Sequence, residues 1–552
     1  MSDYNPPIKD MQFLIHDVLG FTHEDLDRET TEAILGEAAK LASEVLAPIN
    51  RAGDEHGAKL DTHTHTVTTA PGWKEAYAQY TQGGWNAVPF DEEFGGQNLP
   101  YALAFPIQEM WQGANMSFGL CPLLNQGAVE AIHHHGSDAQ KAEYLPNLIS
   151  GEWTGTMNLT EPHAGSDLGL LRTKADKQED GTYKISGQKI WITYGEHDLT
   201  ENIIHLVIAK TPDAGEDVKG ISLFIVPKFL ADGTRNDVKC VGLDHKLGIH
   251  ASPTCVMQFG DEGGATGYLV GEEGQGLKYM FTMMNNARLS VGLQGVAIAE
   301  RAYQHAAAYA AERVQGKSLS SGERVTIDQH KDVQRMLLTM QSQIEAGRAL
   351  TLEAALAMDA GDSEKVNLLT PIVKAWCTDM AVEVTSLGVQ IHGGCGFVEE
   401  TGAAQFFRDA RILPIYEGTN GIQALDLAFR KTLRDGGAAT KTYIETIKER
   451  VSNDAQAFDP AIKKLESATA RILELSAAKD LDTIQAMATP YLKGFGIIAA
   501  GSLLTQAAEK AQNNEDTEFA THKKRIESFY KSNILPFALA HLDAAINGAD
   551  KV

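Results

Sequence analysis

The chain has 552 residues, of which 43% are hydrophobic and 22% are charged, a mixture typical of folded globular proteins. This length exceeds what one hydrophobic core supports, so about three or four domains or subdomains are expected. The formal net charge of -25 gives the surface no overall attraction for nucleic acid or for an anionic membrane. An anionic ligand would therefore depend on local dipoles and a few well-placed cations.

The cysteines and the absence of long apolar stretches indicate a reducing, cytoplasmic setting. The five cysteines include no C-x-x-C pair and are odd in number, so reduced and buried thiols are expected rather than disulfides. The first residues, MSDYNPPIKDMQF, lack the basic and apolar regions of a secretory signal. No stretch approaches the ~18 uninterrupted apolar residues that a membrane span requires. We therefore expect neither secretion nor an integral membrane segment.

The predicted elements change character along the chain. Residues 1–150 are expected to form an N-terminal segment and a helical domain, because apolar residues share one helical stripe after Thr30. Residues 151–276 contain short runs rich in β-branched and aromatic residues, separated by Gly, Asp and Pro, which predict a β-domain. Its expected strands are TYKISGQKIWIT (182–193), NIIHLVIAKT (202–211), GISLFIVPKF (220–229) and PTCVMQFG (253–260).

Residues 277–438 return to a helical periodicity, as in HKDVQRMLLTMQSQI (330–344), and a long helix is expected to stop at Gly393 and Gly394. Residues 439–552 remain amphipathic and predict an appended helical domain. The order is therefore helices, a β-domain and more helices. Because no βαβ alternation occurs, a doubly wound nucleotide-binding fold is not expected.

Two motifs lie in the predicted β-domain. MNLTEPHAGSD (157–167) offers neutral donors from Thr160, Ser166 and the backbone, which suit a flavin edge or a phosphate oxygen. The same residues are also those of an ordinary turn. GQKIWITYG (187–195) places Trp191 and Thr193 where they could wall an aromatic cofactor, although a core tryptophan on a strand is the commoner case.

Two further motifs lie in the helical region. In AERVQGKS (311–318), Arg313 could bind a phosphate, or it could mark a helix C-terminus capped by Gly316. QIHGGCGFVEE (390–400) has glycines that permit close backbone approach to a ligand, or that form an ordinary loop. No metal site is expected, because consecutive histidines such as His133, His134 and His135 do not converge on a helix. The short basic run at residues 523–525 is expected to be a solvated helix face.

In this order, and followed by YEGT (416–419), the motifs resemble the flavin-dependent acyl-CoA dehydrogenase family over about residues 30–435. The segment NPPIKDMQFLIHDVLG (5–20) and the C-terminal extension resemble a large bacterial subgroup. That subgroup includes 3-(methylthio)propanoyl-CoA dehydrogenase and enzymes for other acyl chains. The acyl group therefore stays open between methylthiopropanoyl and fatty acyl.

The resemblance implies an α+β multidomain fold. It consists of an N-terminal helical domain, a central β-barrel-like domain and a C-terminal four-helix bundle, followed here by the appended helical domain. It also implies FAD, a homodimer, and oxidation of an acyl-CoA to the trans-2-enoyl-CoA. The substrate loses the Cα proton to a base and the Cβ hydride to the flavin. An electron-transfer flavoprotein then reoxidises the flavin.

The resemblance makes Glu417 the catalytic base. A free glutamate has a pKa of about 4.3, and the apolar approach Ile412, Leu413, Ile415 and Tyr416 predicts a buried site that raises it. In the family, the base's own backbone N–H and a flavin ribose hydroxyl polarise the thioester. The alternative for Glu417 is an N-cap or first-turn acid on the helix dipole. Ala287 stands where some relatives carry their base, which leaves Glu417 as the candidate.

The resemblance assigns the remaining site residues by position. The flavin ring would contact Met157, Leu159 and Thr160, with Trp191 and Thr193 covering it. Ser166 would lie near the pyrophosphate and CoA, Thr419 would bind FAD of the same subunit, and Arg288 and Gly418 would bind substrate. The neighbouring subunit's FAD would be reached by Arg313, Gln390, Gly393 and Gly394. The segment RVQG (313–316) is one residue shorter than the family's R-x-x-F-G pattern and lacks its aromatic residue.

One alternative function stays open, and the residues oppose three others. An acyl-CoA oxidase would pass electrons from the flavin to oxygen, and the sequence does not separate it from a dehydrogenase. Nitroalkane oxidases and flavin hydroxylases of related fold do not use a glutamate base, so Glu417 opposes both. A non-catalytic DNA-binding relative would require a basic surface, which the net charge of -25 opposes.

Overall fold

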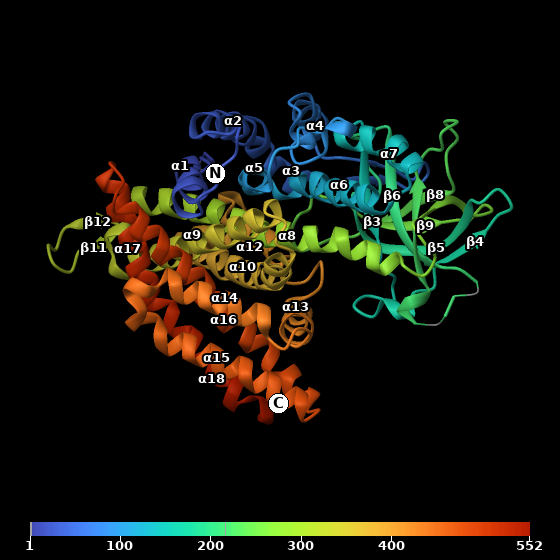
Figure 1. Ribbon diagram of the computed structural model, residues 1–552. Coiled ribbons are helices and arrows are strands. Elements are labelled where there is room, and N and C mark those ends of the chain that lie inside the picture. Colours follow the sequence, from blue (N-terminus) through green and yellow to red (C-terminus); the bar gives the residue numbers. More distant parts are fainter. Residues whose placement is uncertain (1–2, 213, 216) are drawn as a thin grey trace. The chain divides into compact units, whose positions relative to one another are not determined.

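The computed structural model describes residues 3–212, 214–215 and 217–552. They form two compact units (Figure 1). Unit 1 comprises residues 3–43, 101–113 and 288–552, and unit 2 comprises residues 44–100 and 114–287. The expected order of a helical region, a β-barrel-like region and a helical C-terminal region is confirmed. The domain boundaries drawn from the sequence remain predictions.

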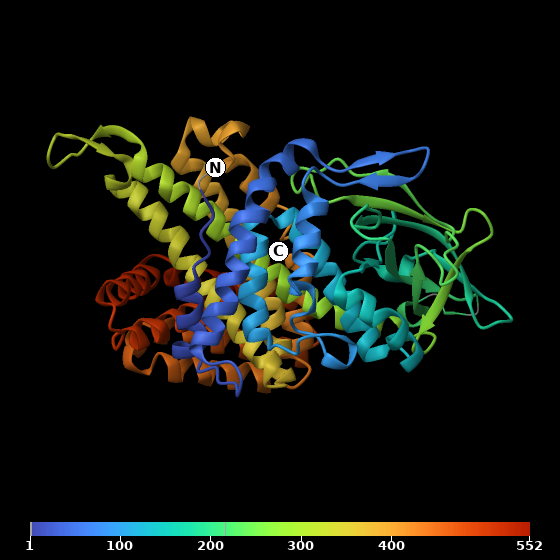
Figure 2. The same ribbon diagram turned by 90° about the horizontal axis from the view of Figure 1, so that it is seen from above.

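Unit 2 begins with helices and one small hairpin. The helices are α3 (Ala47–His56), α4 (Trp73–Gln82), α6 (Met116–His135) and α7 (Asp138–Ser150). The hairpin pairs β1 (Lys59–Asp61) with β2 (Thr66–Thr68), as Figure 2 shows. The expected helical N-terminal region is confirmed, and the hairpin is an addition that the sequence did not indicate. Strands of three residues are too short for an alternating pattern to emerge from the sequence.

The remainder of unit 2 is the β-barrel-like region. Its strands are β3 (Trp153–Asn158), β4 (Lys174–Lys177), β5 (Tyr183–Thr193), β6 (Asn202–Lys210), β7 (Ile221–Pro227), β8 (Val238–Leu243), β9 (Thr254–Phe259) and β10 (Ala265–Val270). The sheet order is β10-β7-β6-β4-β5-β9-β8, and β3 pairs in parallel with β6. Because β10 pairs with both β7 and β5, these strands close into a ring. The predicted strands correspond to β5, β6, β7 and β9.

Both faces of β6 are covered, which explains its uninterrupted apolar run. Alternate side chains, such as Leu206 and Ile208, pack with residues of α6 and α7. The intervening Val207 and Ala209 pack with side chains of β5, β7 and β9 inside the ring. The strand β3, which leads into the loop at residues 157–167, pairs with this buried strand.

Unit 1 is mostly helical. Its longer helices are α2 (Arg28–Lys40), α5 (Tyr101–Ala114), α8 (Gly276–Glu312, whose first turns belong to unit 2), α9 (Lys331–Asp359), α10 (Ser363–His392), α14 (Ala438–Arg450), α15 (Ala455–Ala477), α16 (Leu481–Ala511), α17 (Thr517–Asn533) and α18 (Leu535–Asn547). Shorter helices are α1 (Ile8–Gln12), α11 (Gly394–Phe397), α12 (Ala403–Ala410) and α13 (Asn420–Leu425). A hairpin, β11 (Val314–Lys317) with β12 (Arg324–Thr326), extends beyond α8 (Figure 1).

One hydrophobic core runs through the bundle and the C-terminal extension. Ile344 of α9, Val373 of α10 and Leu465 of α15 belong to the same cluster of buried side chains. Helix α16 packs against α9 and α10 as well as against α15, α17 and α18. The extension is therefore built into the bundle rather than attached at its surface. Among the described residues, no helix has the length and apolar character needed to cross a bilayer.

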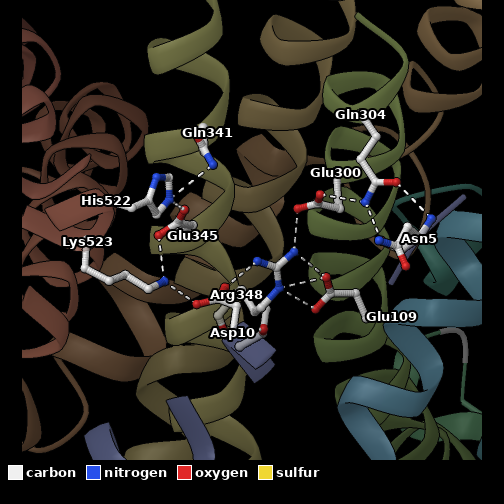
Figure 3. Close-up of polar contacts among 11 residues, drawn as sticks. Asn5, Asp10, Glu109, Glu300, Gln304, Gln341, Glu345, Arg348, His522 and Lys523 are labelled. Carbon is white, nitrogen blue, oxygen red and sulfur yellow. Dashed lines mark hydrogen bonds and ion pairs between the residues drawn. The ribbon is translucent and has the colours of Figure 1, made fainter. Parts of the chain in front are cut away.

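A buried group of charged side chains ties both ends of the chain to the bundle (Figure 3). We name it the Arg348 cluster; its members are Asp10, Glu109, Glu300, Glu345, Arg348, His522 and Lys523. Arg348 contacts carboxylate oxygens of Asp10, Glu109 and Glu300, each at 2.7 Å. Lys523 bridges Asp10 and Glu345. The members come from α1, α5, α8, α9 and α17, so the cluster joins five helices that are distant in sequence.

The Arg348 cluster corrects the expectation for the basic run at residues 523–525. Lys523 is only 3% exposed, whereas Lys524 and Arg525 are exposed. His522 contributes to the same cluster through a 2.9 Å contact with Glu345. The run is therefore a solvated face in two of its three positions and a buried ionic contact in the first.

Candidate functional site

Glu417 lies in a tight turn between α12 and α13. Its φ is +54° and that of Gly418 is +85°, so two consecutive residues adopt the left-handed conformation. A non-glycine residue is uncommon there and marks a locally constrained backbone. Thr419 is the N-cap of α13, and its Oγ accepts a 3.3 Å hydrogen bond from the N–H of Ile422. Glu417 is therefore neither the cap nor a first-turn residue, and that alternative is wrong.

Buried donors hold the carbonyl groups of this turn. The Glu417 carbonyl accepts hydrogen bonds from Arg288 Nε at 3.3 Å and Gln423 Nε2 at 3.2 Å. The Gly418 carbonyl accepts from Lys374 Nζ at 2.9 Å and also from Gln423 Nε2. No described residue accepts a hydrogen bond from the main-chain N–H of Glu417. The turn thus has fixed carbonyl groups, while the N–H of Glu417 makes no hydrogen bond to the described part of the chain.

The charged groups around the turn shift the pKa of Glu417 and of Lys374, and burial is the largest influence on both. Burial raises the pKa of Glu417, while Arg288 and Lys374 act in the opposite direction without cancelling the rise. Burial lowers the pKa of Lys374 to about 7, against the influence of Glu417 and Asp379. Among the described residues, neither Glu417 nor Lys374 forms an ion pair. A half-buried carboxylate without a paired cation binds a proton more readily than an exposed one, as a general base requires.

A chain of neutral side chains holds the residue before the base. Tyr416 donates its hydroxyl hydrogen to Gln294 Oε1, and Gln294 Nε2 donates to Gln112 Oε1 at 3.0 Å. Burial raises the pKa of Tyr416 well above its ordinary value, so the phenol stays protonated. These contacts fix the entry of the chain into the turn from α8 and α5.

In unit 2, the loop at residues 157–167 is held by a carboxylate that the sequence analysis did not single out. Glu161 accepts hydrogen bonds from the N–H of Arg172 at 2.7 Å and from Thr173 Oγ1 at 2.6 Å. Lys189 Nζ, 2.8 Å from Glu161, also donates to the Leu159 carbonyl at 3.0 Å. Burial lowers the pKa of Lys189 to about 8, although Glu161 acts in the opposite direction. Glu161 of the motif MNLTEPHAGSD and Lys189 of the motif GQKIWITYG therefore form one buried ion pair that holds the loop.

Trp191 lies on a β-bulge and not in the core. The register between β5 and β9 shifts between Lys189 and Ile192. Trp191 has a φ of +60°, and its side chain is 61% exposed. The alternative of a core tryptophan is wrong. Bulges commonly redirect a side chain beside a site, and this one leaves a flat aromatic surface uncovered in unit 2.

The other candidates in unit 2 lie on the same segments as these anchors. Met157 is the penultimate residue of β3 and is half-buried, and Leu159 is buried. The Thr160 carbonyl accepts a hydrogen bond from the N–H of Ile190 at 2.9 Å. Ser166 is exposed on the loop. The carbonyl of Thr193 accepts a hydrogen bond from the Thr156 hydroxyl at 2.6 Å.

A second group of candidates lies at one end of unit 1. Arg313 follows the end of α8 and is exposed, while Gln390, Gly393 and Gly394 are exposed at the end of α10. The two helix ends meet where the rings of Tyr309 and His392 stack at 4.5 Å. Gly393 has a φ of +62°, and a Cβ there would meet nothing within 4 Å.

Two expectations near this end are wrong. Gly316, with a φ of +77°, lies in β11 rather than capping α8, which ends at Glu312. Cys395 is exposed, whereas the other cysteines are buried as expected. For Gly316, the helical pattern did not show that α8 ends at Glu312, whereas the expected stop before Cys395, at Gly393 and Gly394, agrees with the end of α10 at His392.

Local sequence patterns did not single out Lys374, Gln423, Glu161 and Lys189. One signal was present for Lys374, a lone lysine within the apolar helix NLLTPIVKAWCTDMAVEV. Its partner in the turn is 44 residues away. No group of three or more His, Cys, Asp or Glu side chains suited to a metal ion occurs in the described part of the chain.

Comparison with known protein families matches the chain along most of its length. The N-terminal, middle and C-terminal domain models of acyl-CoA dehydrogenases match residues 28–152, 156–261 and 274–431. A model described as acetyl-CoA dehydrogenase C-terminal like matches residues 437–552.

Individual relatives match the chain over nearly its full length. A 3-methylmercaptopropionyl-CoA dehydrogenase of Ruegeria pomeroyi is 45% identical, covering 96% of each chain. A butyryl-CoA dehydrogenase of Syntrophomonas wolfei is 36% identical, covering 93% of this chain and 90% of its own. An acyl-CoA dehydrogenase structure from Bacillus anthracis, 23% identical, covers 98% of this chain and 92% of its own with a TM-score of 0.78, and it shares the fold. The protein is thus a member of the acyl-CoA dehydrogenase family.

Proposed function

We propose that this enzyme oxidises a short acyl-CoA thioester, with FAD as cofactor and Glu417 as the base that removes the Cα proton. The observation that carries the proposal is the turn itself, where an unpaired carboxylate adjoins a main-chain N–H without a described acceptor. The names of the relatives support a short acyl group, since one acts on 3-methylmercaptopropionyl-CoA and another on butyryl-CoA. A fatty acyl group of similar length is the second candidate.

The residues present fit FAD. The uncovered face of Trp191 suits a flat ring system, and the neighbouring loop offers neutral donors. Met157, Leu159, Thr160, Ser166, Trp191, Thr193 and Thr419 would hold it, while a second subunit's FAD would be held by Arg313, Gln390, Gly393 and Gly394. When bound, the flavin supplies the acceptor for the Cβ hydride.

Glu417 would do the proton chemistry. Its raised pKa makes the carboxylate a stronger base than an exposed glutamate. The N–H of Glu417 would donate to the thioester oxygen and so increase the acidity of Cα–H. Arg288, Gln423 and Lys374 donate hydrogen bonds to the carbonyl groups of the turn, and these contacts hold the backbone that carries this N–H.

The proposal extends to partners and location. Family resemblance supports an electron-transfer flavoprotein as the electron acceptor, a homodimer in which each subunit completes the other's FAD site, and the cytoplasm as the compartment. An acyl-CoA oxidase is the alternative, and oxygen consumption during turnover separates the two.

The test is an anaerobic titration of the flavin-loaded protein with 3-(methylthio)propanoyl-, butyryl-, octanoyl- and palmitoyl-CoA. We expect the short thioesters to bleach the flavin absorption band, and Glu417→Gln to slow bleaching by about 10²–10⁴-fold, the usual contribution of a general base. Glu400→Gln, at an exposed acid in the same unit, is the matched control and should bleach normally. Normal bleaching by Glu417→Gln, or a protein that binds no flavin, would overturn the proposal.

A further inference from the structure

Lys374 is a buried lysine whose charge has no partner of opposite sign in contact with it. Its side chain is 0% exposed, and Nζ donates to the Gly418 carbonyl and to Asn420 Oδ1, each at 2.9 Å. Other buried lysines, Lys189 and Lys523, contact a carboxylate at 2.8 Å. For Lys374, no such carboxylate is found among the described residues. Because an unpaired buried charge is costly, its presence beside the base requires a reason.

The geometry supplies one reason, which is the conformation of the turn. Glu417 and Gly418 are both left-handed, a conformation that an L-residue such as Glu417 adopts only when its surroundings hold it. Lys374 holds the second carbonyl of this turn and the first residue of α13. Asn420 is held in turn by the Ala375 carbonyl at 3.1 Å and by Asp379 at 2.7 Å. Helix α10 therefore holds the turn and the start of α13 through Lys374, the Ala375 carbonyl and Asp379.

The charge supplies a second reason. A cation near Glu417 favours its ionised form, which is the form that accepts a proton. The charged groups that face this pair are Arg288 from α8, Asp379 from α10 and Asp426 from the helical segment 426–432. Asp379 is itself paired with Lys493 of α16 at 3.2 Å. Asp426 lies 3.8 Å from Arg288. Asp379 and Asp426 therefore each have a cation other than Lys374 as their partner. Lys374 instead donates to the carbonyl of the turn.

We propose that Lys374 is a positioning residue of the dehydrogenation. It fixes the left-handed turn that presents Glu417 and its N–H, and in its protonated form it favours the ionised Glu417 carboxylate that removes the proton. The proposal rests on the proposed role of Glu417 as base. It assigns a chemical task to a residue outside the motifs that carry the family resemblance.

The experiment compares Lys374→Met, which loses both charge and donor, with Lys374→Arg, which keeps the charge. Flavin reduction by the best short thioester is followed by stopped flow as a function of pH. In Lys374→Met the acid limb of the rate should move up by about one pH unit, and the maximal rate should fall about 10–100-fold because the base is misplaced. Lys374→Arg should restore the acid limb. Lys365→Met, on the same helix but paired with Glu353, is the matched control and should keep the wild-type profile.

A second readout does not depend on activity. Hydrogen–deuterium exchange of the segment 412–425 should rise in Lys374→Met and stay at the wild-type level in Glu417→Gln and Lys365→Met. Wild-type exchange and an unshifted acid limb in Lys374→Met would overturn the inference while Glu417→Gln remained inactive. Full activity of Glu417→Gln would instead refute the role of the base, and the exchange result would still decide whether Lys374 holds the turn.

Discussion

Unit 1 contains two buried groups of charged side chains that are built on opposite principles. In the Arg348 cluster every cation contacts a carboxylate, and Arg348 contacts three. Around the base turn, the contact between Arg288 and Asp426 is 3.8 Å, and Glu417 and Lys374 have no ion pair among the described residues. Both groups lie among buried helices, so burial alone does not distinguish them.

The two groups differ in how they shift the pKa of a buried glutamate, Glu345 in the first and Glu417 in the second. Burial acts to raise the pKa of Glu345, but Lys523 and His522 outweigh it and lower the pKa to about 2. Burial raises the pKa of Glu417, and there the nearby cations do not outweigh it. Contact with a cation converts a buried carboxylate into a permanent anion that stabilises the fold. A buried carboxylate without such a contact has a raised proton affinity, which suits it to act as a general base.

The largest effect is expected from Arg348→Met, which tests whether the Arg348 cluster stabilises the fold. The change leaves Asp10, Glu109 and Glu300 buried together without their shared cation, and we expect the free energy of unfolding of unit 1 to fall by about 3–5 kcal/mol. Arg335→Met, on the same helix with an exposed partner, should cost at most about 0.5 kcal/mol. Urea unfolding of both variants checks this. Equal effects of the two changes would contradict a structural role for the cluster.

A second test removes the cation that the C-terminal extension contributes. Lys523→Met should lower the free energy of unfolding by about 2–3 kcal/mol, because Asp10 and Glu345 each lose a contact but keep another cation. The neighbouring Lys524→Met, at an exposed position, should change it by less than about 0.5 kcal/mol. Thermal unfolding midpoints of the pair provide the measurement. A larger effect at residue 524 would contradict the burial pattern.

A third test uses pH. Since the folded-state pKa of Glu345 is lowered from 4.5 to about 2, its stabilisation is complete above pH ~4.5 and is lost as pH falls towards ~2. The difference in stability between wild type and Glu345→Gln should therefore be about 3 kcal/mol at neutral pH and shrink below pH ~4. Urea unfolding between pH 7 and 3 measures it. If the stability difference between the two proteins stayed constant over that range, the ionised form of Glu345 would not be the source of the stabilisation.

The smallest expected effect belongs to the base. The pKa of Glu417 is raised in the folded state, so folding favours its protonated form, and stability decreases as pH rises from ~4.5 through that raised value. Replacing it by Gln should leave stability unchanged or increase it by up to about 1 kcal/mol at pH ~8, although activity is lost. Unfolding of the flavin-loaded proteins tests this. A clear loss of stability would place Glu417 with the Arg348 cluster instead.

The sequence alone indicated the fold wherever a signal was local. The apolar runs of β5, β6, β7 and β9 were predicted, whereas β1, β2, β4, β8 and β10 are short or rich in polar residues and Gly. Glu417 was found because the YEGT motif keeps its residues together. Lys374 was not, because its partner in the turn is 44 residues away. The pairing of Arg348 with Asp10 spans 338 residues, and local periodicity carries no information at that distance.

The contact between Asp10 and Lys523 spans 513 residues, nearly the whole chain. At a synthesis rate of about 5–20 residues per second, Asp10 leaves the ribosome roughly 25–100 s before Lys523 does. During that interval the first helices have no means of completing their ionic contacts, and their charges remain hydrated. Unit 1 therefore finishes folding only when the last helices arrive. A ribosome that stalls before α17 would release a chain with its bundle still open, which cellular proteases can recognise.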